Sequence, residues 1–281
     1  MLSPILHLAS LFLLVSSTFA SPIEKRAALT AVEGARIQTA AQLCMAAYGN
    51  PSSCSSVIPG TTIISQFRSP LGQSGFIAKV PSLKTVVIQF TGTSNAQNLY
   101  SDAAFFSIPL DDAACGSNCL AFAGALVNYR DAKKFTKNFA AAFAAMEPGY
   151  TLTITGHSLG GAVAAVAGVD LAGKATYLIT FGEFRVCSPS TAAYLDRVYG
   201  SNTFRVVHAN DNVVGIVPKT PFNQHHGRAF LLAGTTLASM TECSGPEAAG
   251  CVGGFNPLDH ITYFNTAGTC GKTNPTAGIT V

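Results

Sequence analysis

Residues 151–161 read TLTITGHSLGG, and this stretch decides the fold into which the rest of the chain must fit. Residues 151–155 alternate and are rich in β-branched side chains, which predicts a strand. Residues 159–173 are rich in alanine, which predicts a helix. Between them, GHSLG is the G-x-S-x-G pattern of a nucleophile elbow, with Ser158 at the apex of a strained turn. Glycines flank the serine because a Cβ there would clash with the strand or the helix. The alternative interpretation is a glycine-rich turn with an incidental serine.

The neighbouring segments predict an α/β fold. Helices are expected at residues 27–48, 121–146 and 190–199, and strands at residues 74–80, 85–90, 175–181 and 203–208. This alternation of strands and helices favours right-handed crossovers and one domain with a mostly parallel central sheet flanked by helices. In such sheets the catalytic side chains lie beyond the carboxyl ends of the strands.

Composition limits the function classes. Only 11% of the residues are charged and the net charge is +3, without the basic stripe of a nucleic-acid binder. Residues 1–20 predict a signal peptide, and residues 21–26, SPIEKR, predict a propeptide that ends in a dibasic site. Residues 27–281 are then a single hydrolase domain. No second long apolar segment follows, so we expect a secreted, extracellular protein with no transmembrane anchor.

Eight cysteines in a secreted chain predict disulfide bonds. Cys115–Cys119 and Cys243–Cys251 are expected to close short loops, and Cys44–Cys270 to tie the two ends of the domain together. Whether Cys54 and Cys187 are paired or free stays open. The cysteine spacing does not match a zinc site, and we expect neither a metal nor an organic cofactor.

A serine nucleophile needs a base and a carboxylate that orients the base, and in α/β-hydrolases both follow the serine along the chain. Asp211 emerges where the strand at residues 203–208 ends, at the active edge of the sheet. Asp170 and Asp196 lie inside predicted helices and are poorly placed. We therefore predict Asp211 as the acid of the triad.

Among the histidines, His260 is the predicted base, because one βα unit fits between Ser158 and Asp211 and another between Asp211 and His260. His226, on a loop, is the second candidate. The predicted oxyanion hole uses the backbone N–H of Leu159, directly after the nucleophile, and Thr93, in the loop after the strand at residues 85–90.

Together these residues resemble the fungal class 3 lipase family, an α/β-hydrolase group that includes lipases, mono-/diacylglycerol lipases and feruloyl esterases. GHSLGG resembles the family elbow and implies Ser158 as nucleophile, and VVHANDNVVGIVP resembles the acid loop around Asp211. CSGPEAAGC followed by PLDHITYF implies His260 as base, and QFTGTS implies Thr93 in the oxyanion hole. TFGEFRV resembles a strand-end motif but carries Phe184 where the family usually has proline.

The resemblance also implies a lid at residues 95–106, NAQNLYSDAAFF, with Asn98, Leu99 and Asp102 as lid residues. Leu99 stands in the position that is aromatic in many family lids, and the chain has no tryptophan. A surface helix that buries its apolar face is the alternative. Apolar residues are expected to surround the site and bind substrate: Phe105, Phe106, Val213, Val214, Leu258 and Ile261.

The sequence thus predicts a secreted serine hydrolase that cleaves the carboxylic esters of tri- or partial glycerides through an acyl-enzyme on Ser158. It is expected to act as a monomer at a lipid–water interface, with no nucleic-acid partner. A feruloyl esterase or general carboxylesterase is the alternative enzyme. A non-catalytic lipid-binding relative is the alternative from another class.

Overall fold

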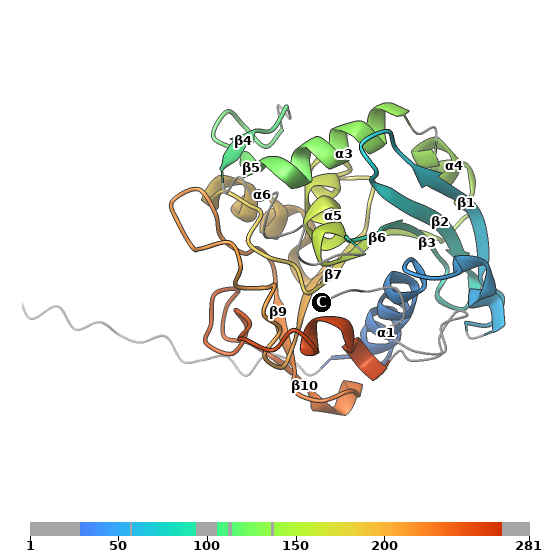
Figure 1. Ribbon diagram of the computed structural model, residues 1–281. Coiled ribbons are helices and arrows are strands. Elements are labelled where there is room, and N and C mark those ends of the chain that lie inside the picture. Colours follow the sequence, from blue (N-terminus) through green and yellow to red (C-terminus); the bar gives the residue numbers. More distant parts are fainter. Residues whose placement is uncertain (1–28, 57, 94–105, 112–113, 136–137, 266–281) are drawn as a thin grey trace, which may run out of the picture.

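The computed structural model describes residues 29–56, 58–93, 106–111, 114–135 and 138–265, and an eight-stranded sheet forms its centre (Figure 1). The strand order is β1-β2-β3-β6-β7-β8-β9-β10. The strands of this sheet are β1 (Thr62–Arg68), β2 (Ser74–Val80), β3 (Thr85–Phe90), β6 (Thr151–His157), β7 (Tyr177–Phe181), β8 (Thr203–His208), β9 (Ala229–Leu232) and β10 (Met240–Glu242). A separate two-stranded sheet pairs β4 (Ser107–Pro109) with β5 (Leu120–Phe122).

The middle of the large sheet is parallel and its margins are antiparallel. β3, β6, β7, β8 and β9 pair in parallel, each with the next. β1, β2 and β3 form an antiparallel meander, and β10 pairs antiparallel with β9. Every residue of β3 and β8 is buried, as expected for strands covered on both faces. The predicted α/β class with a mostly parallel central sheet is confirmed.

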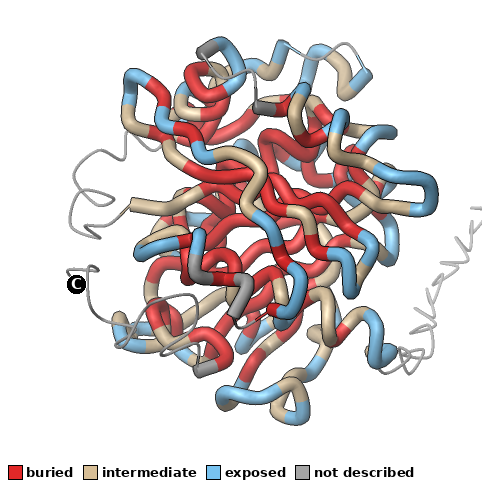
Figure 2. Tube along the Cα trace, turned by 90° about the vertical axis from the view of Figure 1, so that its right-hand side faces the viewer, coloured by how far each residue is buried: buried red, intermediate tan, exposed pale blue. Residues whose placement is uncertain are grey.

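Helices cover both faces of the sheet (Figure 1). α1 (Ala31–Ala46) packs on one face, where Ile37 and Ala40 join Phe181 and Phe204 in one core cluster. The opposite face carries the remaining α-helices of the described chain: α3 (Ala123–Phe135), α4 (Asn138–Ala144), α5 (Leu159–Asp170) and α6 (Pro189–Tyr199). The buried core runs through the middle of the chain trace, between these two layers (Figure 2).

Local sequence explains where α1 begins and how closely α5 packs against the sheet. Thr30 caps α1, its hydroxyl accepts from the Glu33 N–H, and the Glu33 carboxylate accepts from the Thr30 N–H in return. The α5 sequence, LGGAVAAVAGVD, is made of small residues that are almost all buried. Small side chains let the helix lie close against β6 and β7, so its first residue is held rigidly at the sheet.

The predicted helix at residues 121–146 is wrong as one element. β5 occupies Leu120–Phe122, and the helical part is divided into α3 and α4. α3 packs against α5, whereas α4 packs against β1, β2 and β3. One straight helix cannot satisfy both contacts. The sequence also gave no sign of β1, β9 and β10, which lie at the margins of the sheet; β1 buries only one of its seven residues.

Two of the three predicted disulfides are present, Cys115–Cys119 and Cys243–Cys251. The predicted Cys44–Cys270 pair is wrong, because Cys44 is a free, buried thiol. It lies on the inner side of α1, where its Sγ is 3.3 Å from Thr155 Oγ1 of β6. Cys187 is also a free, buried thiol and Cys54 is disulfide-bonded, so these two cysteines are not paired with each other.

Candidate active site

The chain turns directly from β6 into α5 at Ser158. Ser158 has φ +59° and ψ −131°, a backbone conformation that non-glycine residues rarely adopt. Its N–H donates to the Phe181 carbonyl oxygen at 2.9 Å, which ties the turn to β7. A Cβ on Gly156 would run into the Gly160 carbonyl, and a Cβ on Gly160 would run into the Phe90 carbonyl. The flanking glycines are therefore a steric requirement of this turn.

Asp211 and His260 meet directly. Nδ1 of His260 lies 2.9 Å from each carboxylate oxygen of Asp211. Asp211 is fully buried and His260 is 5% exposed. Because a carboxylate only accepts hydrogen bonds, Nδ1 of His260 carries a proton in this pair, and Nε2 is the nitrogen that can gain or lose one.

Three groups hold the Asp211 carboxylate in its ionised form. Burial alone would raise the pKa of Asp211, but the charge of His260 and its hydrogen bond lower it, as do hydrogen bonds from Tyr263 and the Val213 N–H. The Val213 N–H donates to Oδ1 at 2.8 Å, and the Tyr263 hydroxyl donates to Oδ2 at 2.6 Å. The pKa of Asp211 therefore lies below its usual value, and the buried acid stays charged.

Tyr263 was missed by the sequence analysis. It is fully buried, and its hydroxyl also accepts from the His208 N–H at 3.1 Å. Burial and the adjacent Asp211 carboxylate raise the pKa of Tyr263 well above its usual value, so it remains a donor. Its place three residues after His260 carries no recognisable spacing signal, because the contact depends on how the chain folds back toward β8.

A segment before His260 is fastened to the acid loop. The Gly254 N–H donates to the Asp211 carbonyl at 3.0 Å, and the Asn256 N–H donates to the Asn210 carbonyl at 2.8 Å. In return, the Asp259 carboxylate accepts from the Asn210 N–H at 2.8 Å. These bonds bring the two triad candidates together although they lie far apart in the sequence.

The two oxyanion candidates belong to segments that adjoin the serine. Leu159 is the first residue of α5, where helix N–H groups point toward the turn. Thr93 follows Gly92, whose ideal Cβ would stand only 3.0 Å from Ser158 Cβ. The loop after β3 therefore runs directly against the elbow, as the prediction for Thr93 requires.

The second base candidate, His226, belongs to a different buried cluster. Its Nε2 lies 3.1 Å from a carboxylate oxygen of Glu183, and both side chains are fully buried. Arg185 makes a bidentate ion pair with Glu247 nearby, and Glu247 also accepts from the His225 N–H. The structure pairs His226 with Glu183 and His260 with Asp211, so of the two base candidates only His260 contacts the predicted acid.

Charges in this cluster are shielded from water. Burial lowers the pKa of Arg205 to about 10, and it lowers the pKa of His225 well below its usual value, helped by the positive charges of Arg205 and Arg185. His225 is therefore neutral. Arg205 donates to the carbonyls of Pro246 and Cys251, so the cluster anchors the disulfide loop that leads toward His260.

The predicted substrate-binding residues fall into two groups. Val213, Val214 and Ile261 are buried, whereas Phe106 and Leu258 are more than half exposed. Phe105 and the lid candidates Asn98, Leu99 and Asp102 lie outside the described residues. Phe255, which was not predicted from the sequence, is 98% exposed as well.

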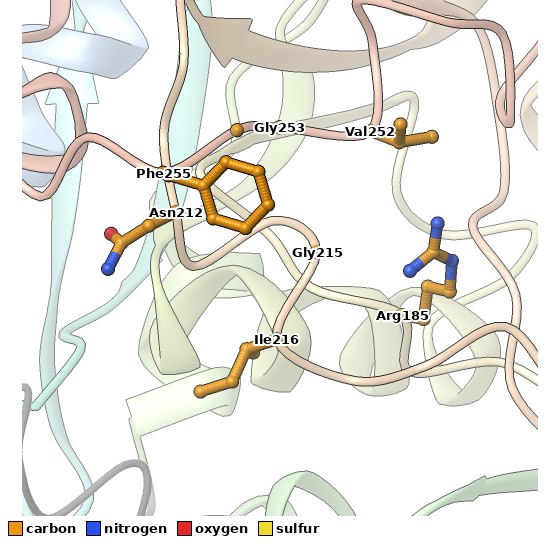
Figure 3. A pocket seen from close by; sticks show the side chains of 8 residues that line it. Arg185, Asn212, Gly215, Ile216, Val252, Gly253 and Phe255 are labelled. Atoms are coloured by element: carbon orange, nitrogen blue, oxygen red, sulfur yellow. The ribbon is translucent and has the colours of Figure 1, made fainter.

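A pocket of about 590 Å³ lies beside the acid loop (Figure 3). Its lining residues are Arg185, Asn212, Gly215, Ile216, Val252, Gly253, Gly254 and Phe255. Phe255 and Asn212 stand at one end and Arg185 at the other, with Ile216 on the wall between them (Figure 3). The pocket thus adjoins the acid loop that carries Asp211 and the segment that leads to His260.

In the described part of the chain, no group of three or more histidine, cysteine or acidic side chains is placed to hold a metal ion. None of the helices in the described ranges has the length and apolarity needed to cross a bilayer.

A serine on a nucleophile elbow, followed along the chain by an aspartate after β8 and then by a histidine, on a mainly parallel sheet, defines an α/β-hydrolase. The family described as Lipase (class 3) matches residues 87–225. The chain belongs to the fungal class 3 lipase family.

Curated relatives and solved structures agree with this membership. A secreted mono- and diacylglycerol lipase of Fusarium solani is 29% identical over 210 residues, 71% of this chain and 62% of the relative. A lipase of Rhizopus niveus is 28% identical over 77% of this chain and 58% of the relative. The chain thus spans about three fifths of the length of these relatives. The crystal structure of a lipase from Rhizopus microsporus var. chinensis superposes with a TM-score of 0.72 at 25% identity, covering 85% of this chain and 89% of that one.

Proposed function

We propose that this protein is a serine hydrolase that cleaves the carboxylic esters of glycerides through an acyl-enzyme on Ser158. The observation that carries the proposal is the buried Asp211–His260 pair, joined at 2.9 Å, at the same sheet edge as the Ser158 elbow. Along the chain, the serine, the aspartate and the histidine follow one another in the order found in α/β-hydrolases.

Each member of the pair has one task in the proposed reaction. Nε2 of His260 accepts the Ser158 hydroxyl proton while Oγ attacks the ester carbonyl, and the same nitrogen then protonates the leaving alcohol. Asp211 holds Nδ1–H of His260 and stabilises the imidazolium that forms. In the second half of the reaction, water gives a proton to Nε2 of His260 while its oxygen attacks the acyl carbon. The bond to Ser158 Oγ then breaks, His260 returns the proton to Oγ, and the acid is released.

The oxyanion of the tetrahedral intermediate would be bound by the Leu159 N–H and by Thr93. Donors fixed by a helix start and by a loop packed against the elbow need no reorganisation when charge develops. Loss of one such donor typically costs about 3–4 kcal/mol of transition-state stabilisation.

The substrate class follows from apolar surface and from the relatives. The site has an apolar border that suits acyl chains. This border consists of the exposed side chains of Phe106, Phe255 and Leu258 and of the pocket beside Ile216. The Fusarium solani relative is a mono- and diacylglycerol lipase and the Rhizopus relatives are lipases. We propose tri- or partial glycerides at a lipid–water interface as the substrate of this chain.

The proposal includes secretion. Residues 1–20 would be a signal peptide, residues 21–26 a propeptide, and residues 27–281 the hydrolase domain, acting as a monomer. The short-loop disulfides and the secreted relatives in Fusarium solani and Penicillium cyclopium support an extracellular location.

The test is hydrolysis of tributyrin across its solubility limit, with a diacylglycerol and methyl ferulate measured alongside. A rise in rate when droplets form would support a lipase. Faster hydrolysis of methyl ferulate without such a rise would move the assignment to a feruloyl esterase.

Variants of the triad candidates decide whether the chemistry is assigned to the right side chains. Ser158→Ala should abolish both turnover and labelling by a fluorophosphonate, and it serves as the blank. His260→Ala should be nearly as deep a loss, whereas His226→Ala should retain most of kcat in the fraction that folds. Full turnover in Ser158→Ala, or equal losses for the two histidines, would contradict the scheme.

A further inference from the structure

The side chain of His157, directly before the proposed nucleophile, joins two hydrogen-bonding groups that have no role in the triad. Its Nε2 lies 2.6 Å from the His260 carbonyl oxygen, and its Nδ1 lies 2.9 Å from the Tyr48 hydroxyl. His157 is 1% exposed. Its ring also lies against that of His260, with centroids 4.4 Å apart and planes tilted by 33°.

The hydrogen-bond partners fix the direction of each bond. A carbonyl oxygen can only accept, so Nε2 of His157 donates to His260. Nδ1 of the neutral ring is then an acceptor and takes the proton of the Tyr48 hydroxyl. Burial, followed by the nearby Cys44, raises the pKa of Tyr48 well above its usual value, which keeps this hydroxyl protonated.

Tyr48 reaches the loop that leads to Thr93 as well. Its hydroxyl accepts a hydrogen bond from the Gly92 N–H. The approach is so close that a Cβ on Gly92 would overlap the Tyr48 hydroxyl and stand 2.6 Å from the His157 carbonyl oxygen. A single phenol, from the turn that follows α1, therefore bonds the loop that carries Thr93 on one side and His157 of the elbow on the other.

We infer that Tyr48 and His157 form a positioning clamp that holds the oxyanion loop, the nucleophile elbow and the main chain of the catalytic base in register. This inference rests on the proposed function, because it assigns a task to residues that touch the proposed triad and not the substrate. The clamp helps to set where the His260 ring stands relative to Ser158. It acts through the His260 main-chain carbonyl, whereas Asp211 acts through Nδ1 of the ring.

A clamp of this kind acts on kcat more than on KM. Loosening it displaces the base and the oxyanion donors without removing any group that contacts substrate. Since a displacement of about 1 Å at a reacting group costs about 10²-fold in rate, partial loosening is expected to cost about tenfold.

The primary test is Tyr48→Phe, which removes the hydroxyl and keeps the ring. With the soluble ester p-nitrophenyl butyrate we expect kcat to fall about tenfold with KM within about twofold, and the rate of fluorophosphonate labelling to fall with kcat. Tyr199→Phe is the matched control, because that hydroxyl donates to the Gly168 carbonyl in a buried contact between α6 and α5. It should lower thermal stability while kcat stays within about twofold.

Conservative replacement of His157 gives an independent reading. His157→Gln keeps an N–H that can reach the His260 carbonyl and should retain more kcat than His157→Leu. A double-mutant cycle of Tyr48→Phe with His157→Leu should be non-additive, because both variants break the same chain of bonds. The clamp would be overturned if His157→Gln and His157→Leu had the same kcat, or if kcat were unchanged in Tyr48→Phe. It would also be overturned if Tyr199→Phe lost as much kcat as Tyr48→Phe.

A readout without turnover separates this inference from the proposed function. The His260 Nδ1 proton, bonded to Asp211, should give a downfield NMR signal whose exchange with water is faster in Tyr48→Phe and unchanged in Tyr199→Phe. If the unmodified protein hydrolyses no ester but this pattern is seen, the proposed function fails and the clamp stands. An unchanged signal in Tyr48→Phe would overturn the clamp whatever the activity.

Discussion

Gly182, which follows β7, lies directly behind the Asp211–His260 pair. An ideal Cβ at this position would stand 2.8 Å from Asp211 Oδ2 and 2.9 Å from His260 Nδ1 and Cε1. Ordinary van der Waals contact begins at 3.4 Å, so Gly182→Ala forces these groups to retreat by about half an ångström. Gly182 also has φ +56°, where an alanine is strained.

The two effects can be given magnitudes. Holding a non-glycine residue at positive φ costs about 1–2 kcal/mol, and overpacking a filled site adds about 1–3 kcal/mol. The free energy of unfolding should therefore fall by about 2–5 kcal/mol. Displacing the acid and base by about half an ångström should lower kcat about 10- to 100-fold in the protein that remains folded.

Gly200→Ala is the matched control, because Gly200 has φ +51° and nothing lies within 4 Å of its ideal Cβ. It carries the backbone strain without the collision. Urea unfolding gives the stability of both variants, and kcat is measured per active site counted with a fluorophosphonate. A kcat for Gly182→Ala within about twofold of the unmodified protein, or an equal kcat loss in Gly200→Ala, would refute the steric argument.

Three further outcomes are expected. Asp211→Asn should lower kcat about 10⁴-fold with the fold retained, because an amide does not hold His260 in the required tautomer. Single-turnover kinetics should show that the acylation step is the one that slows. Burial alone would raise the pKa of Glu247, but the hydrogen bonds and charge of Arg185 and the hydrogen bond from the His225 N–H lower it below its usual value. The contribution of ionised Glu247 to the stability of the fold is therefore complete above the unfolded pKa of about 4.3, and it is lost as the pH falls through the lower folded value. Glu247→Gln should therefore cost about 2–3 kcal/mol at pH 7 in urea unfolding, and a difference that persisted unchanged at pH 3 would contradict the ion-pair interpretation. Burial raises the pKa of the Cys44 thiol to about 12. This thiol should therefore resist a thiol reagent at pH 8 in the folded protein and react when the protein unfolds. Rapid reaction in the folded state would contradict its burial.

Strong local signals were read correctly from the sequence. The elbow at Ser158 and the buried strands β2, β3 and β8 lie where the pattern of residues placed them, because β-branched runs and glycine pairs leave the backbone few choices. The aspartate and histidine chosen by chain order also prove to be in contact.

Weak local signals were read incorrectly or not at all. The division of α3 from α4 depends on which surface each helix packs against. β9 and β10 are short strands near the edge of the sheet, and they are strands because they pair with their neighbours rather than because of a local sequence pattern. The pairing of Cys44 failed for a similar reason, since the spacing of cysteines says nothing about which side of α1 faces the sheet.

The sequence by itself determined the α/β class, the strained serine turn and the order of the proposed triad, because these depend on local propensity, on glycines beside Ser158 and on the direction of the chain. Only the tertiary structure decided which groups support that triad. Tyr263 donates a hydrogen bond to Asp211, which lies 52 residues earlier in the sequence. His157 contacts two residues that lie far from it on either side in the sequence, namely Tyr48 and His260. Such contacts arise from packing of distant segments, and their energies depend on burial and on angles that no spacing in the sequence records.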